Sequence, residues 1–245
     1  MKTVLLRLEG PLQAWGTRSR FGRRDTEAEP SKSGVIGLLG AALGMPRDDM
    51  RTLAALAECR LGVRVDHEGT LLTDYHTVGS GKFREPDYFV YGVGDHAVMT
   101  HRDYLQNASF LAAVTFEDEA MARRVHDAIG APVWPLVLGR RSCSPSLPIQ
   151  VPKGLVEGSF EDALRKAVFP SRSVPKDGSG EPRRIRMVLE CDAADPEAQP
   201  RQDQPLSFRR GDRHYARRFV RTTFIEPSEL VRLGEDEPCI SLVAS

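Results

Sequence analysis

The segment spanning residues 30–45, PSKSGVIGLLGAALGM, has two serines and a lysine at its start and then becomes apolar. Ser31 or Ser33 can cap a helix, whose first backbone N–H groups have no partner within the helix. These N–H groups and the charge of Lys32 are typical of a phosphate-binding helix start. We therefore predict an anion site at residues 31–34, ending at Gly34. The same sequence is also compatible with a capped helix that packs on a sheet and binds no ligand. Neither a Walker motif nor a GxGxxG motif is present.

Glycines recur along this predicted helix at Gly37, Gly40 and Gly44. Each interior glycine costs about 1 kcal/mol relative to alanine, so several of them need a reason. Their spacing places them on one side, where another backbone can approach closely. We therefore expect Gly37→Val to disturb packing.

Arginines form clusters, although the formal net charge of the chain is +0. Affinity for nucleic acid must therefore come from a clustered face rather than from overall charge. Arginine suits this role, because its planar guanidinium binds phosphate through two hydrogen bonds and stacks on bases. The clusters are Arg18, Arg20, Arg23 and Arg24; Arg140 and Arg141; and Arg209, Arg210, Arg213, Arg217, Arg218 and Arg221.

Residues suited to metal-free RNA cleavage are also present. Such cleavage needs a base, an acid and a cation beside the phosphate. The candidates are Tyr75, His76, Lys82, His101 and Tyr104. The same residues equally fit packing and hydrogen bonding at a strand end, and no spacing rule favours a catalytic pair. The 4 cysteines are far apart without CxxC spacing, which predicts free thiols and neither a metal site nor a cofactor.

The composition is that of an ordinary globular protein, with 245 residues, 40% of them hydrophobic and 28% charged. The start of the chain, MKTVLLRLEGPLQ, lacks the features of a signal peptide. The apolar run after Ser33 is too short to span a membrane. We therefore expect a cytoplasmic protein without membrane contact.

Hydrophobic periodicity predicts a strand, helix, strand, strand, helix, strand order within residues 3–138. The expected strands are 3–8, 61–65 paired with 70–75, 109–116 and 133–138, and the expected helices are 30–45, 48–59 and 119–129. This is the α+β, ferredoxin-like βαββαβ order, which RNA-recognition modules share. Between the first strand and helix, residues 12–16 predict a tight turn that exposes Trp15.

Residues 76–107 break the pattern with glycines, aromatic residues and basic residues, which predicts either a loop or an extended hairpin suited to binding a single strand. After residue 148 the chain changes character. We expect a helix at 160–168, strands at 184–191, 217–225 and 239–243, and loops at 170–182 and 193–205. This predicts two domains: residues 1–148 with an insertion at about 76–107, and a small β-rich domain at 149–245.

Five segments in order, LRLEGPLQAWG, PSKSGVIGLLGAALGMPRDD, LLTDYHTV, HRDYLQNASF and LGRRSCSPSLP, resemble the CasD-type subunits of the type I-E CRISPR Cascade complex. They span residues 5 to about 148. The resemblance implies a subunit without catalytic activity that holds the five-prime handle of the CRISPR RNA. It also implies a cap on the filament of CasC-type subunits, contact with the CasA-type large subunit, and target DNA as a partner of the assembled complex.

On this resemblance, residues 76–107 form a thumb-like hairpin directed at the neighbouring backbone subunit. The handle would lie along residues 13–15, 31–34 and 139–142. The predicted RNA-binding residues are Gln13, Trp15, Arg18, Arg20, Ser31, Lys32, Ser33, Gly34, Lys82, Arg84, His101, Arg102, Tyr104, Arg140, Arg141 and Ser142.

Two alternatives stay open at this point. Relatives in another CRISPR subtype cut the repeat RNA, so a metal-independent endoribonuclease is the second interpretation, although type I-E systems use a separate ribonuclease. A protein-only scaffold with a solvated arginine surface is the third.

We expect replacement of Arg140 and Arg141 together by Ala to lower affinity for the handle while leaving the fold intact. Binding measured across a salt series checks this, because RNA binding through phosphates weakens steeply with salt. A scaffold would bind no RNA.

Overall fold

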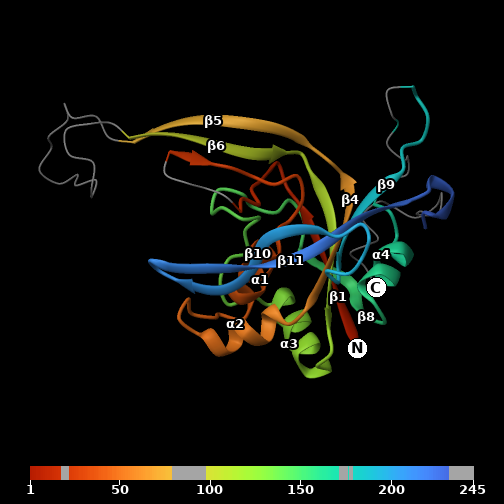
Figure 1. Ribbon diagram of the computed structural model, residues 1–245, viewed down its shortest axis with the longest axis horizontal. Helices are drawn as coiled ribbons and strands as arrows, with labels where there is room; N and C mark the ends of the chain where they lie inside the picture. Colours follow the sequence, from red (N-terminus) through yellow and green to blue (C-terminus); the bar gives the residue numbers. More distant parts are fainter. Residues whose placement is uncertain (18–21, 79–97, 171–175, 177–178, 232–245) are drawn as a thin grey trace, which may run out of the picture.

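The computed structural model describes residues 1–17, 22–78, 98–170, 176 and 179–231, and a seven-stranded antiparallel sheet forms its centre (Figure 1). The α-helices are α1 Lys32–Ala42, α2 Met50–Ala57, α3 Glu119–Gly130 and α4 Phe160–Lys166, and a 3-10 helix spans Pro227–Glu229. The strands are β1 Lys2–Glu9, β2 Leu12–Gln13, β3 Arg23–Arg24, β4 Arg60–His67, β5 Thr70–Val78, β6 Val98–Gln106, β7 Ser109–Phe116, β8 Gln150–Glu157, β9 Ile185–Cys191, β10 Gln199–Arg209 and β11 Asp212–Ile225.

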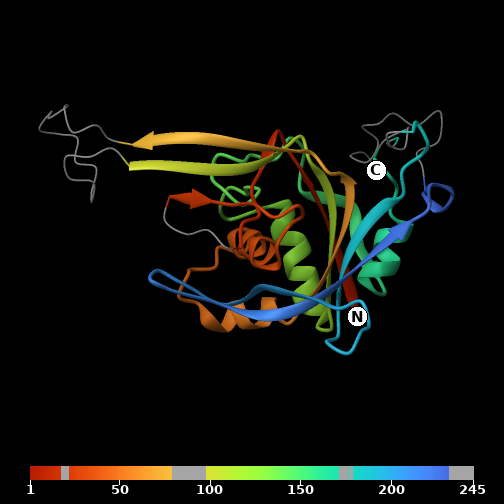
Figure 2. The ribbon, with the colours of Figure 1, turned by 45° about the horizontal axis from the view of Figure 1, so that its top comes forward.

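The central strands are buried on both faces. The order in the large sheet is β10-β11-β9-β4-β7-β1-β8. Along β1, Val4 and Leu6 belong to the larger hydrophobic core, and Leu5 belongs to the core on the other face. Helices α1 and α3 contact each other on the larger-core side, and α4 packs against β4 and β7 on the opposite side (Figure 2). The result is a mixed fold of strands and helices, as the hydrophobic pattern predicts.

The helix starts follow the predicted capping chemistry. The Ser31 hydroxyl accepts a hydrogen bond from the backbone N–H of Gly34, and the Asp49 carboxylate accepts one from Thr52. Side chains of this kind satisfy N–H groups that the helix itself leaves unpaired. The predicted helices at 30–45, 48–59, 119–129 and 160–168 are confirmed, each shorter than predicted except the third. Among the described residues, no helix is long and apolar enough to cross a membrane.

A second, smaller sheet carries a projecting hairpin. Strand β6 pairs with β5 over Thr70–Val78, and it also pairs with the two short strands β2 and β3 at different positions along its length. The β5–β6 hairpin extends away from the body of the molecule (Figure 1). For residues 76–78 and 98–106, the extended-hairpin interpretation is therefore right and the loop interpretation is wrong. Residues 79–97 lie outside the described part of the chain.

Three predicted details of the strands are wrong. Strand β5 pairs with β6 and not with β4, because β7 and β9 occupy both edges of β4. Residues 133–138 form no strand: Val133 and Trp134 donate backbone hydrogen bonds to Ala42 and Ala41 at the end of α1, and β8 pairs with β1 in their place. Part of the predicted loop 193–205 belongs to β10, which pairs with β11.

The large sheet crosses the predicted domain boundary at residue 148. Strand β8 pairs with β1, and β9 pairs with β4. The division into domains 1–148 and 149–245 stays a prediction about folding units. The two outer strands, β8 and β10, both show register shifts in their pairing.

No other backbone approaches Gly37 or Gly40 closely. A Cβ on Gly37 would meet nothing within 4 Å, and one on Gly40 would meet only the flexible Met45 side chain. The close-approach argument for Gly37 is therefore wrong. The close approach occurs elsewhere, at Gly139, where φ is +92° and a Cβ would lie 1.7 Å from the Ala14 carbonyl oxygen.

We expect Gly139→Ala to lower the free energy of unfolding by at least about 2 kcal/mol, because it adds backbone strain and a backbone clash. The matched control is Gly37→Ala, which fills open space on a helix and should raise that free energy by about 0.5–1 kcal/mol. Urea denaturation of both variants measures the difference. Equal stabilities would contradict the assigned close approach at Gly139.

Candidate functional site

Trp15 lies at the centre of the predicted site residues. Its side chain is only 1% exposed, so the expected exposed tryptophan is wrong. The indole N–H donates to the Gln13 side-chain oxygen at 3.0 Å, and the Gln13 amide nitrogen donates to the Leu8 and Ala108 carbonyls. With these bonds made inside the protein, Gln13 and Trp15 position their neighbours.

Three segments that are distant in the sequence meet this buried pair. A Cβ on Gly34, in the first turn of α1, would lie 2.8 Å from the Trp15 ring. The Trp15 carbonyl accepts from the N–H of Glu27, and the N–H of Ala14 donates to the Leu138 carbonyl. The start of α1, residues 24–27 and the loop at 138–142 are therefore held together around one side chain.

The start of α1 already receives an anion from within the chain. The N–H of Lys32 donates to a carboxylate oxygen of Asp203 at 2.7 Å. The Lys32 side chain is 2% exposed, and its ammonium lies 3.0 Å from Glu190. The chain itself thus supplies the carboxylate at the position predicted for a phosphate. RNA contact by Ser31, Lys32, Ser33 and Gly34 stays a prediction.

Asp203 also joins this helix start to the C-terminal strands. Its two carboxylate oxygens accept from Arg218 at 2.7 and 2.9 Å, and Arg218 also lies 3.6 Å from Glu190. Asp203, Lys32 and Arg218 are all at most 9% exposed. A buried charge without a partner is costly, so these groups stabilise the fold only as a complete set.

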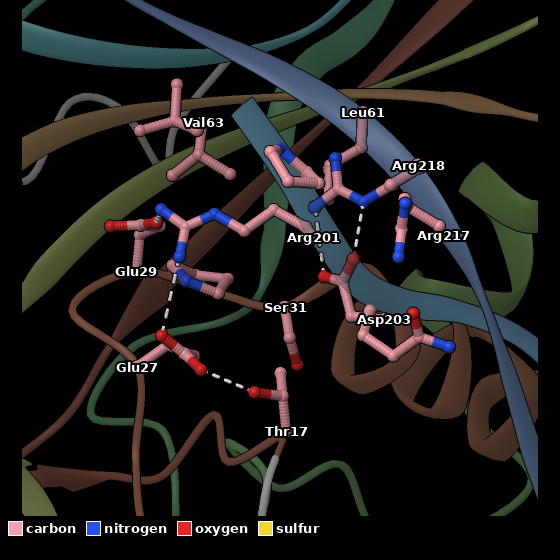
Figure 3. Close-up of a pocket in the computed structure, with 14 residues that line it drawn as sticks. Thr17, Glu27, Glu29, Ser31, Leu61, Val63, Arg201, Asp203, Arg217 and Arg218 are labelled. Atoms are coloured by element: carbon pink, nitrogen blue, oxygen red, sulfur yellow. Dashed lines mark hydrogen bonds and ion pairs between the residues drawn. The ribbon is translucent and has the colours of Figure 1, made fainter. Parts of the chain in front are cut away.

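A pocket of about 280 Å³ opens beside this network (Figure 3). Leu61 and Val63 form part of its apolar lining, and Arg201 spans it to reach Glu27 and Glu29. The guanidinium of Arg217 also lines the pocket but makes no ion pair with any described residue. The pocket is thus apolar on one side and strongly charged on the other.

Glu29 links the pocket to a further ion-pair chain. Arg186 lies 3.0 Å from Glu29 and 2.8 Å from Glu68. Burial alone would raise the pKa of Glu68, but the hydrogen bonds and charges of Arg186 and Arg183 hold that pKa below its ordinary value. The stability that Glu68 contributes is present at neutral pH and is lost as the pH falls through this lowered pKa.

The second group of predicted residues surrounds Arg140. Its guanidinium donates to the carbonyls of Asp103, Arg24 and Asp25 at 2.8–3.1 Å and lies 4.6 Å from the centre of the Tyr104 ring. Arg140 therefore binds strand β6 to the segment after β3. The expectation that replacement of Arg140 and Arg141 together by Ala leaves the fold intact is not supported, because three carbonyls would lose their donor in Arg140.

Near Arg140 lies a set of more accessible arginines, which we call the β3–β6 basic surface: Arg24, Arg102 and Arg141. Arg23 stands opposite His101 and Arg24 opposite Arg102 in the pairing of β3 with β6. Arg23 is also 3.5 Å from the buried Asp103 carboxylate. Arg141 and Ser142 follow Arg140 and are exposed. Arg140 donates to the Arg24 carbonyl and lies over Tyr104, which shares one face of β6 with Arg102, so Arg24 and Arg102 are held beside the loop at 139–142. Arg23 and His101 directly precede Arg24 and Arg102, so their side chains point to the other face.

The residues suited to catalysis do not converge. Tyr75 and His101 face each other across β5 and β6 with ring centres 5.3 Å apart. His76 follows Tyr75 directly in β5, so its side chain points to the other face. Tyr104 is buried beneath Arg140.

Burial raises the pKa of the Cys59 thiol to about 12, which keeps it protonated at neutral pH.

Among the described residues, no group of three or more His, Cys, Asp or Glu side chains could hold a metal ion. Four predicted RNA-binding residues, Arg18, Arg20, Lys82 and Arg84, lie outside the described part of the chain. The roles of Asp203, Glu190 and Arg201 were not predicted from the sequence. They lie beside α1 only because of the register of strands β9, β10 and β11. Residues 193–205 were predicted as a loop, so this register could not be predicted for Asp203 and Arg201.

Comparison with known proteins gives matches over most of the chain. A family model described as CRISPR-associated protein (Cas_Cas5) matches residues 3–221. The CRISPR system Cascade subunit CasD of Escherichia coli (strain K12) is 39% identical over 158 residues, which cover 60% of this chain and 68% of that protein.

Solved structures match over nearly the full length. One, "Crystal structure of Cas protein", has a TM-score of 0.71 and 36% identity, and the match covers 94% of this chain and 97% of that one. A chain of "CRISPR RNA-guided surveillance complex" has a TM-score of 0.77 and 30% identity, with 98% and 97% covered. The likeness in structure therefore includes the C-terminal strands as well as the first 148 residues.

We expect Asp203→Ala to lower the free energy of unfolding by about 3–5 kcal/mol, because Arg218 and the start of α1 would lose a buried anionic partner. The exposed Asp212→Ala serves as the control and should change it by no more than about 0.5 kcal/mol. Denaturant unfolding followed by circular dichroism measures both. A small effect of Asp203→Ala would mean that the network does not hold α1 to β10.

Proposed function

The chain belongs to the Cas5 family of CRISPR-associated proteins, and we propose that it grips the five-prime handle of the guide RNA in a Cascade-type surveillance complex without cutting it. The E. coli relative is a Cascade subunit, and a full-length structural match is a chain of an RNA-guided surveillance complex. The proposal rests on that membership and on the β3–β6 basic surface.

The β3–β6 basic surface is the observation that carries the proposal. It combines cations from β3, β6 and the 139–142 loop, and Arg140 and Trp15 hold these segments in fixed positions. Guanidinium groups on a preorganised surface bind phosphates with little loss of side-chain freedom. Arg24, Arg102 and Arg141 make no ion pair with any described residue, so their charge is available to a phosphate.

The fold supports the same proposal. Strands β4, β7, β1 and β8 lie in that order, with α1 between β1 and β4 in the chain and α3 between β7 and β8. We take this unit as the ferredoxin-like βαββαβ domain. Its fourth strand is β8, and not the segment at 133–138.

The projecting β5–β6 hairpin is then the thumb, directed at a neighbouring CasC-type subunit. The CasA-type large subunit and the target DNA complete the proposed partners. A catalytic role is not favoured, because Tyr75, His76 and Tyr104 do not share one face of the hairpin. The protein is proposed to act in the cytoplasm.

We expect Arg24→Gln together with Arg141→Gln to weaken binding of the repeat-derived RNA roughly tenfold at moderate salt, equivalent to about 1.4 kcal/mol. The slope of log affinity against log salt should fall by about 1.4, because each phosphate contact to a single strand contributes about 0.7. Fluorescence anisotropy with labelled handle RNA measures both values. The two side chains are exposed, so the melting temperature should not change.

The matched control replaces Arg123 and Arg124 of α3 with Gln, which removes the same charge from another exposed surface. If both variants lost the same RNA affinity, the effect would come from overall charge, and the proposed site would be contradicted. The same samples, resolved on a denaturing gel, test catalysis. Specific cleavage that disappears in His76→Ala or His101→Ala would replace the proposed holder with an endoribonuclease.

A further inference from the structure

The arginine cluster at residues 209–221 separates into two groups in the structure. Arg218 and Arg221 are engaged in ion pairs, Arg218 with Asp203 at 2.7 Å and Arg221 with Glu161 at 2.9 Å. The other members, Arg209, Arg210, Arg213 and Arg217, are exposed and make no ion pair with any described residue. Their charge is therefore not used to hold the fold together.

Three of these arginines, Arg209, Arg210 and Arg213, lie at the tip of the β10–β11 hairpin, whereas Arg217 lines the pocket described above. Only residues 219–225 of β11 pair with β9, so the part nearer the turn is a two-stranded ribbon. The turn is tight: Arg209 pairs with Asp212, and Gly211 has a φ of +81°. In both ribbon views this hairpin and the β5–β6 hairpin extend toward the same side of the molecule (Figure 1, Figure 2).

The tip carries a strong local charge. Within residues 209–213 there are three arginines and one acidic residue, Asp212, which accepts a hydrogen bond from His214. In a chain with a formal net charge of +0, this is a segregated basic patch. Such a patch attracts polyanions, and arginine in particular forms paired hydrogen bonds with phosphate.

The aromatic residues near the turn point to the kind of nucleic acid. Phe208 and Tyr215 are both half-buried, and Phe208 packs against the larger hydrophobic core. Proteins that bind single strands without sequence preference stack bases on aromatic side chains. The Phe208 ring is already packed against the core, and residues 209–213 at the tip include no aromatic residue. Phosphate contacts alone suffice for duplex DNA, and a two-stranded ribbon fits its major groove.

We propose that the tip of the β10–β11 hairpin, through Arg209, Arg210 and Arg213, binds the phosphate backbone of double-stranded DNA without reading its sequence. This contact is separate from the proposed RNA surface. The tip belongs to the seven-stranded sheet, whereas β3 and β6 belong to the smaller sheet. A subunit of this kind holds a guide RNA and a DNA duplex at two different places.

The test is a triple substitution, R209Q/R210Q/R213Q, in the full chain. Binding to a labelled 30-base-pair duplex, unrelated to the guide sequence, is followed by anisotropy across a salt series. We expect the slope of log affinity against log salt to fall by about 2 to 3, because each duplex phosphate contact contributes about 0.9. A second duplex of different sequence should show the same loss.

Two further variants make the result specific. The control R47Q/R51Q/R124Q removes the same charge from exposed arginines elsewhere and should leave the slope unchanged. The variant R209K/R210K/R213K keeps the charge and should retain most of the slope. Circular dichroism should show one melting temperature for all of these proteins.

The handle RNA provides the second arm. We expect the affinity of the triple glutamine variant for this RNA to be within about twofold of that of the wild type. R24Q/R141Q should have a lower affinity for the RNA and an unchanged affinity for the duplex. No duplex binding by the wild type, an unchanged slope in the triple variant, or the same loss in the control would overturn the proposal. Loss of RNA binding with duplex binding intact would assign the tip to the guide and would also overturn it. If the wild type bound no RNA, the proposed RNA surface would be contradicted, but the duplex measurements would still test the proposal for the tip.

Discussion

The buried carboxylate of Asp203 is the interaction on which the arrangement of this protein depends. It accepts from the first turn of α1 and from Arg218 of β11, so it fixes an N-terminal helix to a C-terminal hairpin. Because an unpaired charge in such a place is costly, neither partner can move without the other. The pocket beside it and the direction of the β10–β11 hairpin follow from this constraint.

Trp15 supplies the corresponding apolar constraint. Polar surfaces that bind RNA are most effective when their loops are held in place before the ligand arrives. Here an indole ring packs on Gly34, and the backbone next to it meets the 138–142 loop at Gly139. The loop that carries Arg141 is thus supported by backbone contacts that leave no room even for a methyl group. This explains why residues as distant as Arg24 and Arg141 can contribute to one surface.

Much of the local structure could be predicted from the sequence, and the errors concern long-range partners. Capping residues such as Ser31 and Asp49 act on N–H groups three positions away, so their pattern is readable in the chain. The pairing of β5 with β6, by contrast, is decided by strands that are far away in sequence and already occupy β4. The same limit applies to the site. The pattern of Lys32 suggested a free cation, and only the fold brings Glu190 to within 3.0 Å of it.

The two outer strands of the large sheet carry a consequence for assembly. Pro152 lies in β8, where Lys153 has a positive φ of 54°, and Pro200 and Pro205 lie in β10. Proline offers no amide hydrogen, and a kinked backbone cannot align with a straight neighbour. An incoming strand from another molecule would therefore find an interrupted row of donors at either border. These two borders are therefore poorly suited to strand pairing with a neighbouring chain, and the large sheet ends where this polypeptide ends it.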